Sequence, residues 1–255
     1  MPRSLPVILA TLVALGGAAE AATLDEILAK NLAARGGEAR LRAITSLRRT
    51  GKVAFGREGA VQAAWASVQQ RPGSVRNETT LQGLTAVEAF DGRVGWRVSP
   101  FGGRTEPEQV SGDDARALAH DAELEGPLVG WRAKGHRIEL LGTEDVDGTL
   151  AIKLRVTRKD GELAYVYLDP DSSLEIRVVE IHKVRGAEQI TETDLGSYQE
   201  VAGVWLPFAI ESGPLGGPHP VRLTIERAEA NVAVDAAWFA VPASKAAAAA
   251  VIVPG

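Results

Sequence analysis

The chain contains no cysteine among its 255 residues. This absence excludes a disulfide framework, a cysteine nucleophile and a cysteine that could be acylated at the N-terminus of a mature lipoprotein. Aromatic residues are scarce too, at 5% of the chain, whereas hydrophobic residues of all kinds reach 45%. We therefore expect a large core of mainly aliphatic side chains to stabilise the fold.

Clustered positive charge is also missing. The formal net charge is -5, and the basic residues occur in short groups such as Arg48–Arg49. A mildly acidic chain without a basic patch is not expected to bind nucleic acid or to hold a lipid surface by electrostatics.

Recognisable catalytic motifs are absent, including G-x-S-x-G and H-E-x-x-H. The histidines fall in four different predicted elements, and none has a carboxylate or a second histidine at metal-ligand spacing; they are His120, His136, His182 and His219. We expect no enzymatic activity, no cofactor and no metal. If the chain is nevertheless a secreted hydrolase, the residues to test are His120, His136 and Asp169.

One acidic segment has the spacing of a calcium loop. Asp169, Asp171, Ser173, Glu175 and Glu180 fall on positions 1, 3, 5, 7 and 12 of an EF-hand count. The sharp-turn position is Leu174 instead of glycine, and no helical pattern flanks the segment. A hairpin turn is the better interpretation.

The N-terminus has the three parts of a secretory signal peptide. Arg3 gives a positive start, Val7–Leu15 is a short apolar run, and Ala19–Ala21 is a cleavage site of small residues. The run is too short to span a bilayer. We expect residues 1–21 to be removed and the mature protein to lie outside the cytoplasm, in the periplasm, without a lipid anchor.

The start of the mature chain is helical. Thr23 and Glu26 fit a capping box, apolar residues then recur at helical spacing, and Gly36–Gly37 ends the helix. Shorter helices are predicted over Glu38–Ile44 and after Ser111–Asp114.

Most of the remaining chain alternates between apolar and polar residues, as in Leu150–Val156 and Val221–Glu226. Asp-Gly pairs at 91–92, 147–148 and 160–161 predict tight hairpins. We predict roughly ten or eleven antiparallel strands, forming one large curved sheet in residues 22–242. Short helices cover its apolar concave face, and residues 243–255 form an alanine-rich tail.

These segments together resemble the LolA/LolB-like superfamily, in particular its outer membrane lipoprotein-sorting protein branch. The resemblance covers nearly the whole mature chain in family order. Its pieces include Ala34–Gly37, Leu41–Ile44, Asp91–Gly92, Gly95–Trp96, Pro100–Gly103, Gly126–Val129, Lys134–Gly135, Glu139–Gly142, Gly148, Lys153–Val156, Tyr165–Asp169, Ile176–Arg177, Tyr198, Gly203–Phe208 and Trp238–Pro242.

The resemblance implies a half-open β-barrel with helices as a lid, and a monomeric periplasmic carrier of acylated lipoprotein or lipid. Its partners would be an inner-membrane exporter and an outer-membrane acceptor, with transient membrane contact only. A sensor or accessory module acting with an inner-membrane protein is the alternative.

Strand parity then selects residues for the cavity wall, because a shift of one residue turns a strand's apolar face toward water. The predicted residues are Trp65, Leu81, Phe90, Trp96, Leu154, Tyr167, Ile176 and Leu223.

Overall fold

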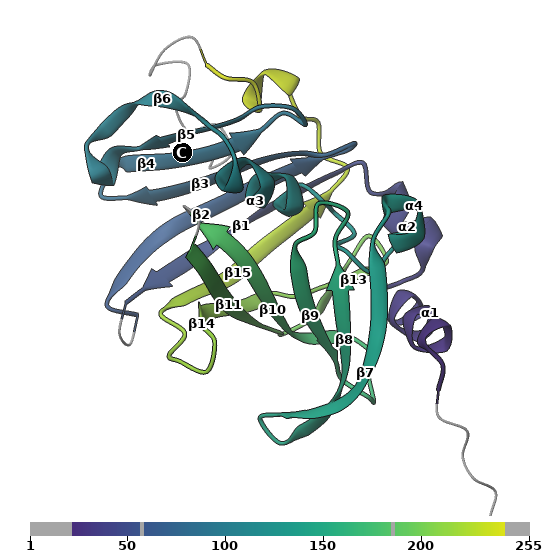
Figure 1. Cartoon of the computed structure of the whole chain (residues 1–255). Coiled ribbons are helices and arrows are strands. Elements are labelled where there is room, and N and C mark those ends of the chain that lie inside the picture. The colour runs from purple at the N-terminus through teal and green to yellow at the C-terminus, as the bar shows by residue number, and fades with distance from the viewer. Residues whose placement is uncertain (1–21, 57–58, 185–186, 243–255) are drawn as a thin grey trace, which may run out of the picture.

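A computed structural model describes residues 22–56, 59–184 and 187–242. Within them, thirteen strands form a single antiparallel sheet that remains open, and two further strands pair apart from it (Figure 1). The predicted curved antiparallel sheet is confirmed, with more strands than the turn signals indicated. The predicted signal peptide and the predicted alanine-rich tail lie outside the described residues.

The sheet is a meander whose middle joins the two ends of the chain. Its strands, in spatial order, are β6 (Arg104–Val110), β5 (Gly95–Ser99), β4 (Leu84–Phe90), β3 (Ser74–Leu81), β2 (Val61–Gln70), β1 (Ser46–Phe55), β15 (Val221–Ala230), β14 (Ala209–Pro214), β11 (Ala187–Gly196), β10 (Glu175–Val184), β9 (Leu163–Leu168), β8 (Thr149–Thr157) and β7 (Arg137–Val146). The separate pair is β12 (Gln199–Val201) and β13 (Val204–Leu206).

The helices are few and short: α1 (Leu24–Ala34), α2 (Glu38–Ala43), α3 (Asp113–Asp121), α4 (Trp131–Lys134), and the 3-10 turns η2 (Pro100–Gly102) and η3 (Ala236–Trp238). The capping box of α1 is confirmed, since Glu26 N–H donates to the Thr23 hydroxyl and Thr23 N–H donates to the Glu26 carboxylate. No helix within the described residues is both long and apolar enough to cross a membrane.

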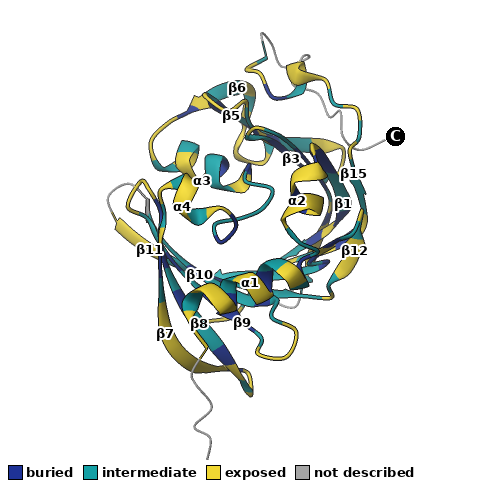
Figure 2. Ribbon diagram, turned by 90° about the vertical axis from the view of Figure 1, so that its right-hand side faces the viewer, coloured by how far each residue is buried: buried dark blue, intermediate teal, exposed yellow. Residues whose placement is uncertain are grey.

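The sheet curls, and α1, α2 and α3 lie on the inside of the curve (Figure 2). We call this the inner face and the opposite side the outer face. Paired residues of antiparallel strands share a face. Thus Leu47 of β1 faces inward together with its partner Gln69, and Val178 of β10 faces inward together with Val166 and Thr193.

Apolar clusters fill both faces. On the inner face, Ile27 of α1 packs with Leu154, Val156 and Val166, and Leu41 packs with Val204 and Phe208. On the outer face, Phe239 of the C-terminal segment covers Ala66 and Val68. Because the sheet is buried on both sides over these stretches, apolar character alone does not tell which face a residue occupies.

Candidate functional site

A cavity of about 290 Å³ opens on the inner face beside the α1 core. Its apolar wall comes from strands of both halves of the sheet and from the segment before α4; it includes Leu47, Leu128, Val166, Val178, Leu195 and Leu206. The volume is just below the range of about 300–1,000 Å³ for small-molecule sites. In this state the cavity has room for a short apolar group.

A buried ion pair forms one side of the cavity. Arg35 Nη1 lies 3.4 Å from Glu175 Oε1, and both side chains are about nine-tenths buried. Arg35 also donates to the Glu125 carbonyl at 2.7 Å, and the Tyr198 hydroxyl donates to the Glu175 carbonyl at 2.8 Å. Burial raises the pKa of Tyr198, which keeps its hydroxyl a neutral donor.

A second charged group, Arg49, reaches the cavity from β1. It donates to the Gln69 side chain at 3.2 Å and lies over the Trp65 ring, but its buried Nε has no hydrogen-bond partner. Burial lowers the pKa of Arg49, against the opposing charge of Asp121. At Asp121 itself, desolvation together with Glu180 raises the pKa to about 6.

Arg158 completes the polar part of the wall. Its guanidinium lies 3.4 Å from Glu123 and 3.7 Å from Glu180, and the side chain is 7% exposed. The cavity therefore combines an apolar wall with charged groups that mostly neutralise one another. Such a lining suits an amphiphile better than a fully polar ligand.

The space beneath α1 is packed, because Ile27 is 5% exposed within the inner core. An open groove of about 390 Å³ instead runs between α1 and α4, with Leu28, Leu32 and Trp131 along it. Leu128 lines both this groove and the cavity, so it separates the two spaces.

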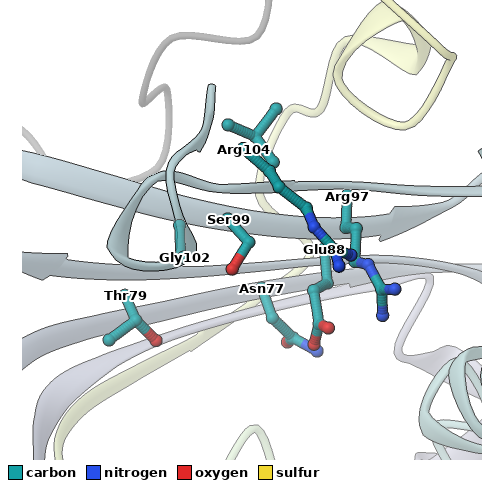
Figure 3. A pocket seen from close by; sticks show the side chains of 9 residues that line it. Asn77, Thr79, Glu88, Arg97, Ser99, Gly102 and Arg104 are labelled. Atoms are coloured by element: carbon teal, nitrogen blue, oxygen red, sulfur yellow. The ribbon is translucent and has the colours of Figure 1, made fainter. Parts of the chain in front are cut away.

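A third pocket, of about 380 Å³, lies near the far edge of the sheet and is polar. Figure 3 shows Asn77 and Glu88 side by side in it, as expected of paired residues on β3 and β4. Desolvation raises the pKa of Glu88 above its ordinary value, although the charge of the nearby Arg97 opposes this shift. These polar walls do not suit an acyl chain.

Five of the residues predicted for the cavity wall face inward by strand register: Trp65, Leu81, Phe90, Leu154 and Leu223. None of them is among the residues that line the 290 Å³ cavity. Leu154 is fully buried in the core under α1, Phe90 packs near α3, and Leu223 packs on the core around Leu41.

The remaining three lie on the outer face, which corrects the predicted parity. Trp96 is fully buried there, and its ring N–H donates to the Phe239 carbonyl at 2.8 Å. Tyr167 packs in an outer cluster with Val179 and donates from its hydroxyl to Glu144.

For Ile176 the reason is a β-bulge. Glu175 pairs with Leu168 and Arg177 pairs with Tyr167, so Ile176 is an extra residue in β10. The bulge leaves Ile176 packed against the outer cluster while Val178, two residues on, faces inward. The alternation of apolar and polar residues in the sequence does not indicate this extra residue.

The lining residues that the sequence did not single out are mostly polar or outside the strands. Arg35 follows α1, Leu124 and Leu128 lie in the segment between α3 and α4, and Tyr198 follows β11. Period-two alternation carries no information about such positions. The buried Arg35–Glu175 pair joins residues 140 positions apart, which no local pattern indicates.

The calcium-like spacing at 169–180 corresponds to a hairpin turn between β9 and β10. Asp169 Oδ1 accepts N–H bonds from Asp171 and Ser172, while Glu175 is bound to Arg35. The first and seventh positions therefore already have intramolecular partners. The hairpin interpretation is confirmed.

Comparison with known proteins finds resemblance in structure only. No protein-family model matches the sequence, and no curated protein matches it. A LolA superfamily protein from Nitrosomonas europaea aligns with a TM-score of 0.57 and 14% identity, over 86% of this chain and 98% of that one.

Two further solved structures align comparably. One, from Vibrio parahaemolyticus, is a domain provisionally assigned as an outer membrane lipoprotein-sorting protein, with a TM-score of 0.54 and 13% identity over 82% of this chain and 93% of that one. The other is a DUF1329 family protein from Desulfovibrio piger, with a TM-score of 0.52 and 12% identity over 85% and 96%. At these identities the likeness establishes the fold, which is LolA-like.

Proposed function

We propose that this protein, which has a LolA-like fold, is a non-enzymatic periplasmic carrier that binds the acyl part of a lipoprotein or another amphiphile. The observation that carries the proposal is the inner-face cavity, whose wall joins Val166, Val178 and Leu195 to buried ion pairs. The signal peptide predicted at residues 1–21 supports export across the inner membrane.

The energetics of carriage favour a cavity of moderate affinity. Burial of acyl carbon contributes about 0.8 kcal/mol per methylene group, so eight buried methylenes contribute roughly 6 kcal/mol before ordering costs. A membrane offers the same gain per methylene. A carrier that receives cargo from an exporter and releases it to an outer-membrane acceptor therefore needs a cavity close in free energy to the bilayer.

The cavity has to enlarge to take a longer chain. Its cover is the segment around Leu124, Pro127 and Leu128, which lies between α3 and α4. Gly126 and Gly130 in this segment have φ of 69° and 66°, in the left-handed region where glycine carries no Cβ penalty. Outward movement of the segment would join the cavity to the α1–α4 groove through Leu128.

Two of the residues predicted for the cavity wall lie on the apolar inner face but outside the cavity. Trp65 of β2 and Leu223 of β15 lie on the inner face on either side of β1, and both pack against the Leu41 cluster. We propose that these inward-facing residues contact cargo that is too long for the cavity.

Ligand binding by a cavity-filling variant tests the proposal. In Val178→Trp, a ring occupies space that the cargo needs, whereas Val61→Trp adds the same ring at an exposed strand end, where Val61 is 41% exposed. We expect the wild type and Val61→Trp to bind a fluorescent palmitate analogue and Val178→Trp to bind at least tenfold more weakly.

Circular dichroism of each variant checks that it is folded, because overpacking costs about 1–3 kcal/mol. If Val178→Trp does not fold, Leu195→Asp replaces it as the cavity variant. Equal affinity in the folded cavity variant and in Val61→Trp would place the ligand elsewhere. Failure of the wild type to bind any acylated ligand would refute carriage.

A further inference from the structure

Three potential metal ligands, none of which lines the cavity, meet where the end of α3 contacts the turn between β8 and β9. His120 lies at the end of α3, while Asp160 and Glu162 lie on the turn from β8 to β9. His120 Nε2 is 2.9 Å from Asp160 Oδ2, and His120 Nδ1 is 3.5 Å from Glu162 Oε2. Among residues 22–56, 59–184 and 187–242, these three alone bring one ligand atom each within 4.8 Å of the others.

The imidazole of His120 is incompletely satisfied in this arrangement. Its Nδ1 is buried and makes no hydrogen bond, because the approach to Glu162 lacks the required geometry. Buried polar atoms in folded proteins nearly always have a partner, so an orphan atom calls for one. A cation bound at Nδ1 beside Glu162 would provide it, and Asp160, whose Oδ2 bonds Nε2 here, would turn toward the ion to complete the group.

The two carboxylates are held in place by groups around them. Asp160 Oδ1 accepts the Glu162 N–H at 3.1 Å, which leaves Oδ2 directed at His120. Glu162 lies 3.2 Å from His182 Nδ1 through Oε2 and 3.2 Å from Arg116 Nε through Oε1. Outer groups of this kind orient ligating carboxylates in metal sites.

We propose that His120, Asp160 and Glu162 form a zinc-binding site. Zinc bonds to histidine nitrogen and carboxylate oxygen are about 2.0–2.2 Å long, so two ligand atoms on one ion lie at most about 4.4 Å apart. The three atoms lie within 4.8 Å of one another, so side-chain rotation has to bring them closer together to meet this limit.

The ligand chemistry selects zinc over the common hard cations. Calcium and magnesium take oxygen ligands, whereas imidazole with carboxylates suits zinc. Three protein ligands leave the fourth position to water. A surface pocket of about 500 Å³ reaches His120 and Asp160 and gives the ion a route from solvent.

Zinc at this position would add to the polar contacts of Arg116 and His120 that already join α3 to the turn between β8 and β9. Helix α3 packs on β3, β4 and β5 as well as on β10, whereas Asp160 and Glu162 belong to the β7–β11 half of the sheet. The ion would hold α3 to the β7–β11 half of the sheet. It would thereby restrict the movement of α3, which precedes the segment that covers the cavity.

Isothermal titration of the tag-free protein, treated with EDTA and then freed of chelator, tests the site. The variants are Asp160→Asn, which retains an oxygen for the turn, and His120→Gln. His219→Gln is the matched control, because His219 also lies between two carboxylates, 3.1 Å from Glu192 and 3.0 Å from Asp194, outside the converging group.

We expect one zinc ion per wild-type chain, unchanged binding in His219→Gln, and at least tenfold weaker binding in Asp160→Asn and His120→Gln. Calcium and magnesium should bind at least a hundredfold more weakly than zinc. Thermal melts identify variants that fail to fold, and Asp160→Asn decides if His120→Gln does not fold.

Absence of stoichiometric zinc binding by the folded wild type would overturn the proposal. So would an equal loss in His219→Gln, or equal affinity for calcium. Cobalt substitution gives a second measurement: visible d–d bands should appear in the wild type and disappear in Asp160→Asn. None of these readouts depends on acyl-ligand binding, so this site and the carrier role can fail separately.

Discussion

Removal of the Glu175 charge is expected to destabilise the protein strongly, because it leaves Arg35 buried without its counterion. The two groups are 3.4 Å apart with side chains 10% and 11% exposed. Loss of one partner of a buried pair costs about 3–5 kcal/mol. For Glu175→Gln we expect roughly 3 kcal/mol, the lower end of that range, since the amide oxygen can still accept a hydrogen bond and Arg35 keeps its bond to the Glu125 carbonyl.

At about 2–4 °C per kcal/mol for a chain of this size, the melting temperature should fall by roughly 6–12 °C. Urea titration gives the free energy of unfolding directly. The double variant Arg35→Met with Glu175→Leu should recover most of the loss, because apolar replacement of a whole buried pair is often neutral or stabilising.

A cost below about 1 kcal/mol for Glu175→Gln would mean that the pair behaves as a solvated surface contact. That result would show that the side of the cavity formed by Arg35 and Glu175 is open to water. A double variant less stable than Glu175→Gln would show that the charges themselves hold the wall together.

Further expected outcomes concern packing and protonation. Gly51→Ala should cost roughly 3 kcal/mol or more in urea unfolding, because its Cβ would lie 2.0 Å from a carbonyl oxygen of β15, whereas Gly196→Ala, with no atom within 4 Å, should change stability by less than about 0.5 kcal/mol. Phe239→Ala should cost about 3–5 kcal/mol by emptying a buried site, and it should also shift the fluorescence of Trp96, whose ring N–H bonds to the Phe239 carbonyl. Because the folded-state pKa of Glu88 is raised, its ionisation costs stability as pH rises above about 4.3; Glu88→Gln should therefore melt higher than the wild type at pH 7.5, with the difference vanishing near pH 4, and an equal difference at both pH values would contradict the assigned shift.

Local patterns predicted the elements of this fold well. The capping box at Thr23 and Glu26 placed the start of α1, and alternation over Leu150–Val156 placed β8 on the inner core through Leu154 and Val156. Both signals depend on residues a few positions apart, which is why a single sequence contains them.

The choice of face was harder, because it depends on insertions and on distant segments. A bulge at Ile176 shifts parity within β10, and the C-terminal segment around Phe239 buries Trp96 on the outer face. Neither the bulge nor the packing of the C-terminal segment can be predicted from the alternation of apolar and polar residues in the strand itself.

The same limit applies to the candidate sites. The expectation that no histidine has a carboxylate at ligand spacing holds along the sequence, yet the fold brings His120 within 2.9 Å of Asp160, 40 positions away. Arg35 and Glu175 are likewise distant in sequence. Such convergence becomes visible only in three dimensions.

Photo-crosslinking of a diazirine-bearing palmitate, with the modified residues mapped by mass spectrometry, shows where on the protein an acyl chain binds. If the protein is a carrier, we expect label on the cavity wall, at Leu128, Val166, Val178 and Leu195, and loss of that label in excess unlabelled palmitate. Label confined to exposed positions outside the cavity, such as Leu150, or label that excess palmitate does not displace, would contradict carriage.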